Sequence, residues 1–463
     1  MLFFECRNDC RDDIRMINSK ELKKRDLYLN RLIAFQDTEP VKVVTGIRRC
    51  GKSSLLKIMI NHLMQHGILP EQILEMNFES FAFRNMTAAD FYAYVKDRIL
   101  PERRMYLFFD EVQLIPAWEN AVNAFRVEFN CDIYVTGSNS YMLSSEYATY
   151  LAGRYVEIKM LPLSFTEFLD FQDFEIQETE IPLGGIRKLI FDRNGRQYQS
   201  RELFDVYMRY GGMPGICDSE LSQEKALIIL EGIYSTVVMR DILEREKRQG
   251  QKKITDPALL RKIITFLADS IGSSISATSI GNTLISSGLF KDTGSKGSPN
   301  ARVPSAHTMQ SYVRALLDAY LFYEIKRFDL KGKKYLRSLG KYYIADLGLR
   351  NCLVGFRDRD RGHALENVVY FELLRRGYDV AVGKADNAEI DFVAVRDGDR
   401  IYVQVTESML GEDVRRRELA PLQGIRDNYA KIVLSLDPGL YSDYGGIKSL
   451  SLIDWLLGAV SPA

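Results

Sequence analysis

Residues 41–54 read Val-Lys-Val-Val-Thr-Gly-Ile-Arg-Arg-Cys-Gly-Lys-Ser-Ser, and this stretch decides the fold of the amino-terminal part. The spacing of Gly46, Gly51, Lys52 and Ser53 matches G-x-x-x-x-G-K-[ST], the pattern of a phosphate-binding loop. A short β-branched run precedes the loop and a helix-compatible segment follows it. The stretch therefore predicts a strand, a loop around phosphate oxygens, and a helix whose amino end faces the phosphates.

The residue types in this loop suit a nucleoside triphosphate. Glycine at 46 and 51 lets the backbone N–H groups turn inward around phosphate oxygens. Lys52 is spaced to reach the β- and γ-phosphates, and the Ser53 hydroxyl to ligate Mg²⁺. The alternative is a turn that happens to carry a lysine. We expect ATP and Mg²⁺ as cofactors, and the expected binding residues are Gly46, Arg49, Cys50, Gly51, Lys52, Ser53 and Ser54.

A second apolar run, Tyr106–Phe109, ends in the carboxylates Asp110 and Glu111. Such a run predicts a buried parallel strand, and ligands lie at the carboxyl ends of parallel strands. Asp110 is expected to hold Mg²⁺ through its water shell, and Glu111 to act as general base on the attacking water. Acidic strand ends also occur for solvation alone, but together with the loop they favour a hydrolysis site.

Residues 132–140 form a further strand candidate with a polar end, Thr-Gly-Ser-Asn-Ser. A Ser, Thr or Asn at this point is placed to sense the γ-phosphate or to hold the water, and we select Asn139. An ordinary Gly-Ser turn is the alternative.

Composition limits the remaining possibilities. The chain has 463 residues, 46% hydrophobic and 27% charged, with 62 basic and 62 acidic residues. A global polyanion-binding surface is not implied, so contact with nucleic acid requires a local patch. Six scattered cysteines and four histidines disfavour a zinc site or a disulfide framework. No apolar stretch is long enough to span a bilayer, and we expect a cytoplasmic protein without a membrane partner.

Alternation of strands and helices predicts an α/β fold with a parallel sheet and helices on both faces. The strand candidates are residues 41–44, 73–78, 106–109, 133–136 and 156–160. Four domains are expected: a nucleotide-binding core at 20–162, a helical lid or spacer at 163–253 that opens with a Ser164–Glu167 capping box, a winged-helix domain at 254–350, and an α/β domain at 351–463.

The stretch 326–341 is strongly basic, with seven Lys and Arg against a single Asp329. On the wing of a winged helix it would contact phosphates of double-stranded DNA. Lysines also protect solvated hairpin edges from strand pairing, and winged helices also bind proteins, so a protein partner stays open.

With these motifs the chain resembles prokaryotic AAA+ ATPases whose carboxyl-terminal half is a domain of unknown function. The resemblance rests on Gly-Ile-Arg-Arg-x-Gly-Lys-Ser at 46–53, Phe-Asp-Glu-Val-Gln at 109–113 with Trp118, Thr-Gly-Ser-Asn-Ser at 136–140, Leu-Ala-Gly-Arg at 151–154, Pro-Leu-Ser-Phe-x-Glu-Phe at 162–168 and Tyr-Gly-Gly-x-Pro at 210–214.

The resemblance implies roles for further residues. Arg154 is expected to stabilise the transferring phosphoryl group, in cis or from a neighbouring subunit of a homo-oligomer; a structural arginine is the alternative. The carboxyl-terminal unit looks similar to the restriction-endonuclease-like fold, with Glu366 and Asp391 in place. Where acid-x-Lys is expected the chain reads Gln404-Val405-Thr406, which implies a degenerate nuclease site.

The leading hypothesis is therefore an ATPase that couples hydrolysis to rearrangement of a DNA- or protein-binding carboxyl-terminal half. The alternatives are a slow ATP-dependent binding switch and a Mg²⁺-dependent DNA nuclease.

Overall fold

The computed structural model describes residues 22–140, 153–180, 186–217, 223–244, 254, 256–276, 279–282, 305–332, 334–335, 340–385, 388–438 and 441–460. Four residues of the motifs above lie outside these ranges: Leu151 and Ala152 of the Leu-Ala-Gly-Arg motif, and Lys333 and Arg337 of the basic stretch 326–341.

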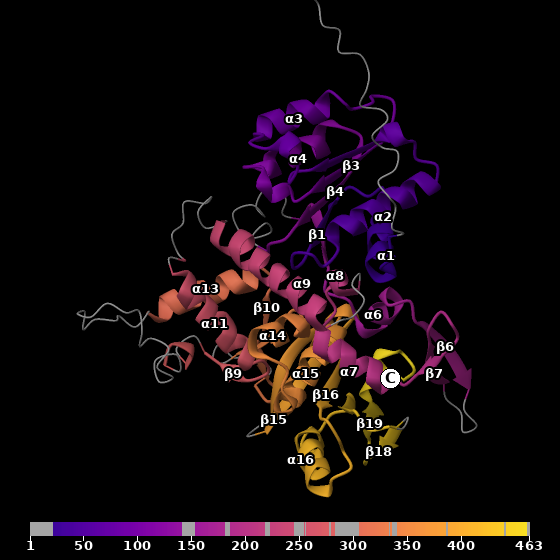
Figure 1. The fold of residues 1–463 in the computed structure, drawn as a ribbon, viewed down its shortest axis with the longest axis vertical. Helices are drawn as coiled ribbons and strands as arrows, with labels where there is room; N and C mark the ends of the chain where they lie inside the picture. The colour runs from indigo at the N-terminus through magenta and orange to yellow at the C-terminus, as the bar shows by residue number, and fades with distance from the viewer. Residues whose placement is uncertain are drawn as a thin grey trace, which may run out of the picture.

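A five-stranded parallel sheet forms the amino-terminal unit, drawn in indigo and purple in Figure 1. Its order is β2-β3-β4-β1-β5. All four pairings are parallel, with Asn77 opposite Asp110 and Thr45 opposite Gly137. The predicted α/β fold with a parallel sheet is confirmed. The strands are β1 (Val41–Thr45), β2 (Ile73–Asn77), β3 (Met105–Asp110), β4 (Cys131–Gly137) and β5 (Tyr155–Lys159).

Successive side chains of these strands enter two different cores, because side chains alternate across a sheet. Val44, Phe108 and Tyr134 pack with the helices of one face, and Val43 and Phe109 with those of the other. Helices therefore cover both faces: α1 (Asp26–Ala34) and α2 (Lys52–Gln65) on the first, α3 (Ala88–Lys96) and α4 (Trp118–Glu128) on the second.

The segment after the first sheet begins with the expected capping box. The Ser164 N–H donates to Glu167 and the Glu167 N–H donates to Ser164 Oγ, at 2.8 and 3.1 Å. The segment is not all helical, because residues 175–198 include a three-stranded antiparallel sheet. The elements are α6 (Phe165–Phe171), β6 (Glu175–Glu180), β7 (Ile186–Phe191), β8 (Gln197–Tyr198), α7 (Ser200–Tyr210), α8 (Pro214–Cys217), α9 (Gln223–Thr236) and the π-helix η5 (Val237–Glu244).

A small antiparallel sheet, β10-β13-β9, packs with three helices in the next segment. The segment expected to form the wing of a winged helix is divided here: β10 pairs with β13, while β11 pairs with β12 and runs parallel to β14 of the following sheet. The elements are α11 (Pro257–Asp269), β9 (Ser274–Ile275), α13 (Ala306–Asp318), β10 (Phe322–Ile325), β11 (Arg327–Asp329), β12 (Lys334–Tyr335), β13 (Gly340–Ile344) and α14 (Leu347–Val354).

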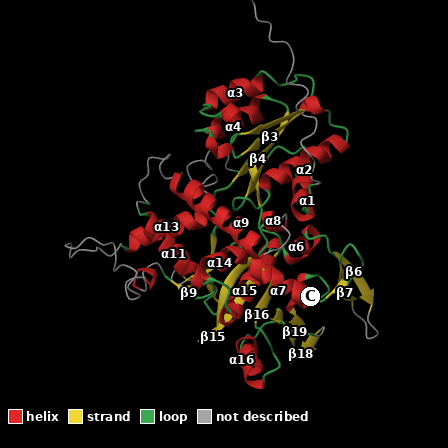
Figure 2. Cartoon of the chain, viewed as in Figure 1, coloured by secondary structure: helices red, strands yellow, loops and turns green. Residues whose placement is uncertain are grey.

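The carboxyl-terminal unit is a mixed sheet of order β12-β11-β14-β15-β16-β17-β19-β18, and its helices are drawn in red in Figure 2. The Asp397-Gly398 turn between β15 and β16 has both φ angles positive, as a two-residue hairpin requires. The elements are α15 (Arg361–Arg375), β14 (Asp379–Ala385), β15 (Ala388–Arg396), β16 (Asp399–Val405), α16 (Glu412–Gln423), β17 (Ala430–Ser435), β18 (Tyr441–Asp443), β19 (Ile447–Ser451) and α17 (Leu452–Leu456).

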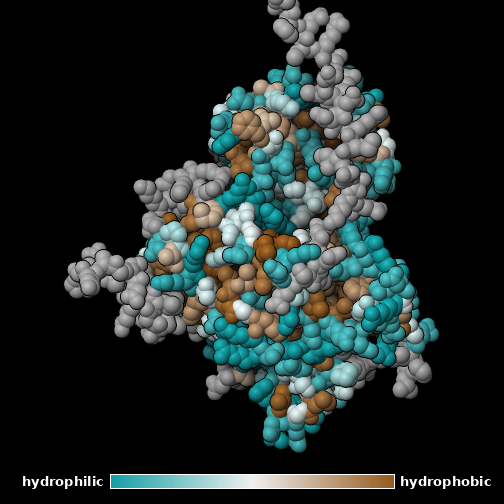
Figure 3. Space-filling view, in the orientation of Figure 1, coloured by the Kyte–Doolittle hydropathy of each residue, from teal (hydrophilic) through white to brown (hydrophobic). Residues whose placement is uncertain are grey.

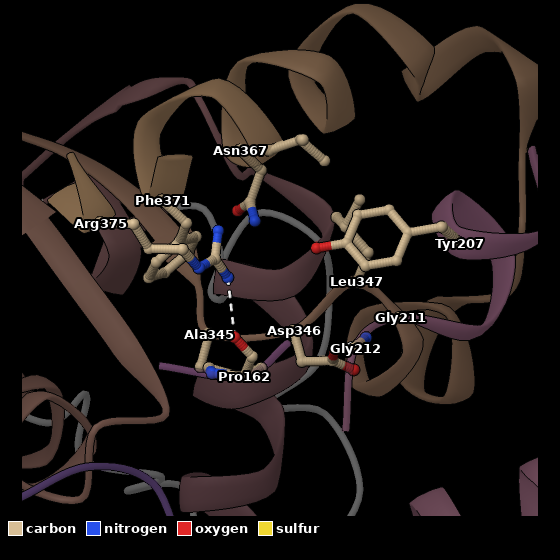
Figure 4. Close-up of a pocket in the computed structure, with 11 residues that line it drawn as sticks. Pro162, Tyr207, Gly211, Gly212, Ala345, Asp346, Leu347, Asn367, Phe371 and Arg375 are labelled. Atoms are coloured by element: carbon tan, nitrogen blue, oxygen red, sulfur yellow. Dashed lines mark hydrogen bonds between the residues drawn. The ribbon is translucent and has the colours of Figure 1, made fainter. Parts of the chain in front are cut away.

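Two arginines from distant parts of the chain hold the peptide that leaves the first sheet. Arg25, just before α1, donates to the carbonyl oxygens of Leu161 and Pro162 at 2.8 and 3.3 Å. Arg375, at the end of α15, donates to the Pro162 carbonyl at 2.8 Å, the bond drawn in Figure 4. Both side chains are buried, so this exit peptide joins the first and last units of the chain.

A cavity of about 20 Å³ lies beside the exit peptide, with room for a single water molecule. Tyr207, Asp346, Asn367 and Arg375 line it, as Figure 4 shows. The cavity is a gap in a packed joint and is too small for a substrate.

On the face shown in Figure 3, hydrophobic residues gather over α9, where Leu227 and Ile228 are exposed. Among the described residues, no helix is long and apolar enough to cross a membrane.

Candidate functional site

The loop after β1 has the backbone of an anion-binding nest. Gly46, Arg49 and Gly51 all have positive φ, at 144°, 66° and 103°. A Cβ on Gly46 would lie 2.1 Å from the Met160 carbonyl oxygen, so only glycine fits there. Alternating backbone handedness turns successive N–H groups toward one point, and the amino end of α2 adds its own free N–H groups. Phosphate binding is what this loop geometry suits.

Lys52 begins α2 and its side chain is buried. The ammonium group donates to the carbonyl oxygens of Gly46 and Ile47, at 3.0 and 3.2 Å. These bonds fold the side chain over the loop, where a bound phosphate chain would meet it.

Asp110, the last residue of β3, is held from two neighbouring strands. Thr136 Oγ1 donates to one of its carboxylate oxygens at 2.5 Å, and Asn77 Nδ2 donates to the other at 3.2 Å. Burial raises the pKa of Asp110, and hydrogen bonds from Thr136 and Ser53 oppose the rise. The Ser53 hydroxyl and the Asp110 carboxylate therefore meet, and two hard oxygen donors beside a phosphate loop fit Mg²⁺.

Glu111 follows in the left-handed region, with φ 54°. Ser138 Oγ donates to Oε1 at 2.6 Å, Gln113 Nε2 donates to Oε2, and the Glu111 N–H donates to Thr136 Oγ1 at 2.9 Å. Burial alone would raise the pKa of this carboxyl, but the Lys52 ammonium and the Ser138 hydrogen bond outweigh it and the pKa is lowered. Glu111 is therefore ionised at neutral pH and able to accept a proton.

The polar end of β4 meets these carboxylates through Thr136 and Ser138, two residues that the sequence interpretation did not single out. It selected Asn139, which is buried and whose Nδ2 lies 3.5 Å from the Asp241 carbonyl oxygen in η5. The usable signal was the run of three polar residues itself, since every second side chain of a strand faces the same side.

Three other expected residues have different surroundings. Arg49 is exposed, Ser54 is half-buried, and the Cys50 side chain is buried in the core, so only its backbone is available to a phosphate. Cys50 Sγ lies 3.6 Å from the Met160 carbonyl oxygen.

Arg154 lies away from the loop. Its carbonyl oxygen accepts from the N–H of Val41, the first residue of β1, and its side chain is exposed. The length of β1, about 16 Å, therefore separates Arg154 from the loop at the other end of that strand. Arg154 therefore lies at the opposite end of β1 from the loop, and its catalytic role stays a prediction.

The residues expected for a degenerate nuclease site do come together. Glu366 lies on α15, Asp391 on β15 and Gln404 on β16, and the Asp391 N–H donates to Gln404 Oε1 at 3.3 Å. Gln404 Nε2 in turn donates to Glu418 on α16 at 3.0 Å.

The cation among these carboxylates is Lys341 of β13, which the sequence interpretation placed in the basic segment. Its Nζ lies 3.1 Å from Glu366, 3.1 Å from Glu389 and 3.8 Å from Asp391. Burial alone would lower the pKa of Lys341, but the carboxylates outweigh it and raise that pKa. A lysine inside the apolar strand Gly-Lys-Tyr-Tyr-Ile was the available signal. Among the residues that the structure describes, no cluster of His, Cys, Asp and Glu is arranged to hold a metal ion.

Two family models match the chain. One, described as "AAA domain", covers residues 38–169, and the other, described as "Domain of unknown function (DUF8612)", covers residues 201–360. An "Uncharacterized protein" of Haemophilus influenzae is 37% identical over 442 residues, which is 95% of this chain and 100% of that protein. The chain belongs to the family of this Haemophilus protein. The AAA domain of the present chain has a P-loop fold of the AAA+ ATPase type.

A second relative, "Uncharacterized protein MJ1544" of Methanocaldococcus jannaschii, is 28% identical over 412 residues, covering 87% of this chain and 83% of that protein. Two solved structures are similar at low level. The ORC1 protein of Aeropyrum pernix, in complex with DNA, has 12% identity and a TM-score of 0.28, covering 71% of this chain and 91% of its own. Cdc6p of Pyrobaculum aerophilum has 11% identity and a TM-score of 0.28, covering 76% and 96%. Likeness at this level carries no argument about function.

Proposed function

We propose that this protein binds ATP with Mg²⁺ at the loop 46–54 and hydrolyses it, and that hydrolysis rearranges the carboxyl-terminal half. The observation that carries the proposal is the ionised Glu111 carboxylate, held by Ser138 and Gln113 within the electrostatic reach of Lys52. A fixed base beside a phosphate-binding nest suits attack of water on a γ-phosphate.

Each residue has a role in this proposal. Lys52 and the loop N–H groups offset phosphate charge, and Glu111 takes a proton from the attacking water. Ser53 would ligate Mg²⁺ and Asp110 would hold it through its water shell, and bound Mg²⁺ would neutralise charge on the β- and γ-phosphates. Asn139 is proposed as the residue that senses the γ-phosphate.

The test is release of phosphate by the wild type, Lys52→Ala and Glu111→Gln. Lys52→Ala is expected to lose ATP binding, whereas Glu111→Gln is expected to keep binding and lose turnover by a factor of about 10² or more. Glu128→Gln, an exposed glutamate on α4, is the matched control and should behave as wild type. Phosphate release by the wild type that is no faster than release by Lys52→Ala would refute hydrolysis. Tight ATP binding without turnover would instead support the slow binding switch.

The proposed partner of the carboxyl-terminal half is double-stranded DNA or a protein. Of the basic segment 326–341, Lys341 is committed to the buried carboxylates and Arg327 lies 3.2 Å from Glu389, whereas Lys326 is exposed. Measuring the ATPase rate with and without duplex DNA, at low and moderate salt, separates the two. Stimulation that fades with salt would support phosphate contacts, and its absence would support a protein partner.

We do not propose nuclease activity. The Lys341 ammonium already lies 3.1 Å from Glu366 and 3.8 Å from Asp391, and burial raises the pKa of Asp391 well above its usual range. Gln404 is a poor Mg²⁺ ligand beside a carboxylate. Cleavage of plasmid DNA that Asp391→Ala abolishes would overturn this view.

A further inference from the structure

The loop arginine Arg48 is held by two carboxylates from outside the loop. Its Nη1 and Nη2 donate to Glu79 Oε1, just after β2, at 3.0 and 2.7 Å. Its Nε lies 3.4 Å from Asp241 Oδ1 in η5. The Arg48 side chain is 12% exposed and that of Asp241 is 9% exposed, so the pair is largely shielded from water.

The Arg48 guanidinium lies near the proposed base Glu111. Arg48 contributes to lowering the pKa of Glu111, after the larger effects of Lys52 and Ser138, which places its charge within electrostatic reach of the proposed base. Burial raises the pKa of Asp241 to about 6, and the charges of Arg48, Glu111 and Lys52 also act on this carboxyl. The four groups therefore share one electrostatic neighbourhood.

The contact between Arg48 and Asp241 is incomplete. Arg48 Nε and Asp241 Oδ2 are both buried, and neither has a hydrogen-bond partner among the described residues. An unsatisfied buried donor on a charged group costs free energy, so a better acceptor that comes within reach would displace Asp241. A guanidinium has five N–H donors and Glu79 takes one from each Nη, so Nε and a remaining Nη hydrogen can bind two oxygens of a γ-phosphate in parallel.

Asp241 also stands where the two family regions meet. It belongs to residues 201–360, whereas Arg48 and Asn139 belong to the AAA domain at 38–169. The Asp241 carbonyl faces Asn139, and the neighbouring Arg240 donates to Glu79 at 3.0 Å. A movement of Arg48 therefore changes the contacts of the helix 223–244 directly.

We propose that Arg48 binds the γ-phosphate in its own subunit, and that Asp241 is the competing anion through which the helix 223–244 responds to the nucleotide. With ADP, Arg48 stays on Asp241; with ATP, it moves to the γ-phosphate and leaves Asp241 and η5. This inference rests on the proposed function, since it requires the loop to bind nucleotide.

The first test compares the affinities of ATPγS and ADP in the presence of Mg²⁺. Arg48→Ala is expected to weaken ATPγS binding about tenfold or more and to change ADP binding less than about twofold, because only the triphosphate offers the γ-oxygens. Equal loss for both nucleotides, or no loss for either, would overturn the inference while leaving the proposed function in place. Failure of the wild type to bind either nucleotide would refute both this inference and the proposed function.

The second test follows hydrogen exchange in residues 223–244 of the full chain. In the wild type, exchange there is expected to be faster with ATPγS than with ADP. Asp241→Asn is expected to exchange fast without nucleotide and to bind ATPγS several-fold more tightly, because the competing charge is gone. Asp269→Asn, which removes an exposed carboxylate that pairs with Arg357, is the matched control and should match wild type. Exchange that is equal in all nucleotide states, or an Asp241→Asn variant with wild-type ATPγS affinity, would refute the role of Asp241.

Discussion

At the scale of single residues, the end of β4 donates hydrogen bonds to two adjacent carboxyl groups, Asp110 and Glu111, whose pKa values shift in opposite directions. Burial raises the pKa of Asp110, while Lys52 and Ser138 overcome burial at Glu111 and lower its pKa. Pairs of titratable groups separated in this way divide ligand and base roles between them. Ser138 contributes to this division after the larger effect of Lys52, since its hydroxyl donates to Glu111.

Ser138→Ala is expected to lower the turnover number about tenfold with little change in KM, because the base Glu111 is no longer held in position whereas ATP binding is unaffected. A base works above its pKa and fails as the pH falls through it. Removing the hydrogen bond raises the pKa of Glu111, so the acidic limb of the rate profile should move to higher pH. Steady-state kinetics between pH 5 and 8 measure both effects, with Ser442→Ala, exposed on β18, as control. An unshifted acidic limb would contradict the assignment of Glu111 as base.

Lys341 is the second residue whose loss has a specific consequence. Lys341→Met leaves Glu366, Glu389 and Asp391 without their cation and is expected to destabilise the protein by about 3–5 kcal/mol at pH 7. The deficit should shrink toward pH 5, because protonation then removes the uncompensated charge. Urea unfolding followed by the fluorescence of the two tryptophans, Trp118 and Trp455, measures this loss of stability.

The matched control for Lys341→Met is Lys326→Met, at an exposed position of the same segment. Equal stability of the two variants would mean that the buried ion cluster contributes nothing. The sequence alone misplaces Lys341 because a stretch with seven basic residues predicts an exposed surface. Only the pairing of β13 with β10 and β9 puts Lys341 in the interior.

At the scale of elements, the turn Tyr210-Gly211-Gly212-Met213-Pro214 is a joint between α7, α14 and the exit peptide. The Gly212 N–H donates to Asp346 at 2.5 Å, and its carbonyl accepts from the Leu163 N–H at 2.7 Å. A Cβ on Gly212 would lie 2.4 Å from the Leu163 carbonyl oxygen. The motif is therefore explained by close packing of backbones.

Gly212→Ala is expected to destabilise the fold by about 2 kcal/mol or more, because backbone must move to admit the methyl group. Gly215→Ala is the matched control: three residues along, in α8, a Cβ meets only the Ile229 methyl at 3.7 Å. Thermal unfolding of the two variants decides the point, and equal melting temperatures would contradict it.

The sequence predicts elements well where burial imposes one period over the whole element. Residues 106–109 are apolar throughout, and residues 41–44 are apolar except for the buried Lys42, because both faces of β1 and β3 are covered; these strands are found where expected. It misses β6, whose residues are exposed except for the half-buried Ile176, so the pattern carries no core signal. It also misses the departure of β11 to β14, since strand pairing across 55 residues (382 minus 327) leaves no local mark.

At the scale of the whole molecule, the position of Arg154 has a consequence for assembly. The P-loop is at the carboxyl end of β1 and Arg154 is beside its amino end. An arginine that serves catalysis from there must reach the loop of another copy, which requires a head-to-tail interface.

Mixing Lys52→Ala with Arg154→Ala subunits tests this arrangement. Each variant alone is expected to be inactive, whereas an equimolar mixture should regain about a quarter of wild-type turnover, because a site then combines an intact loop with an intact arginine from its neighbour. Full activity of Arg154→Ala alone would make it a structural residue. An inactive Arg154→Ala that mixing fails to rescue would contradict action between subunits.

The hydrogen bonds from Arg25 and Arg375 to the Pro162 carbonyl form at different times during synthesis of the chain. The two partners Pro162 and Arg375 are 213 residues apart, so a ribosome needs roughly 10–40 s to add the second after the first. Throughout that interval the nascent ATP-binding unit carries an exit peptide secured on one side only. Nascent chains stalled before and after residue 375 should therefore differ in protease resistance at the exit peptide, although the whole nucleotide loop is already outside the ribosome in both.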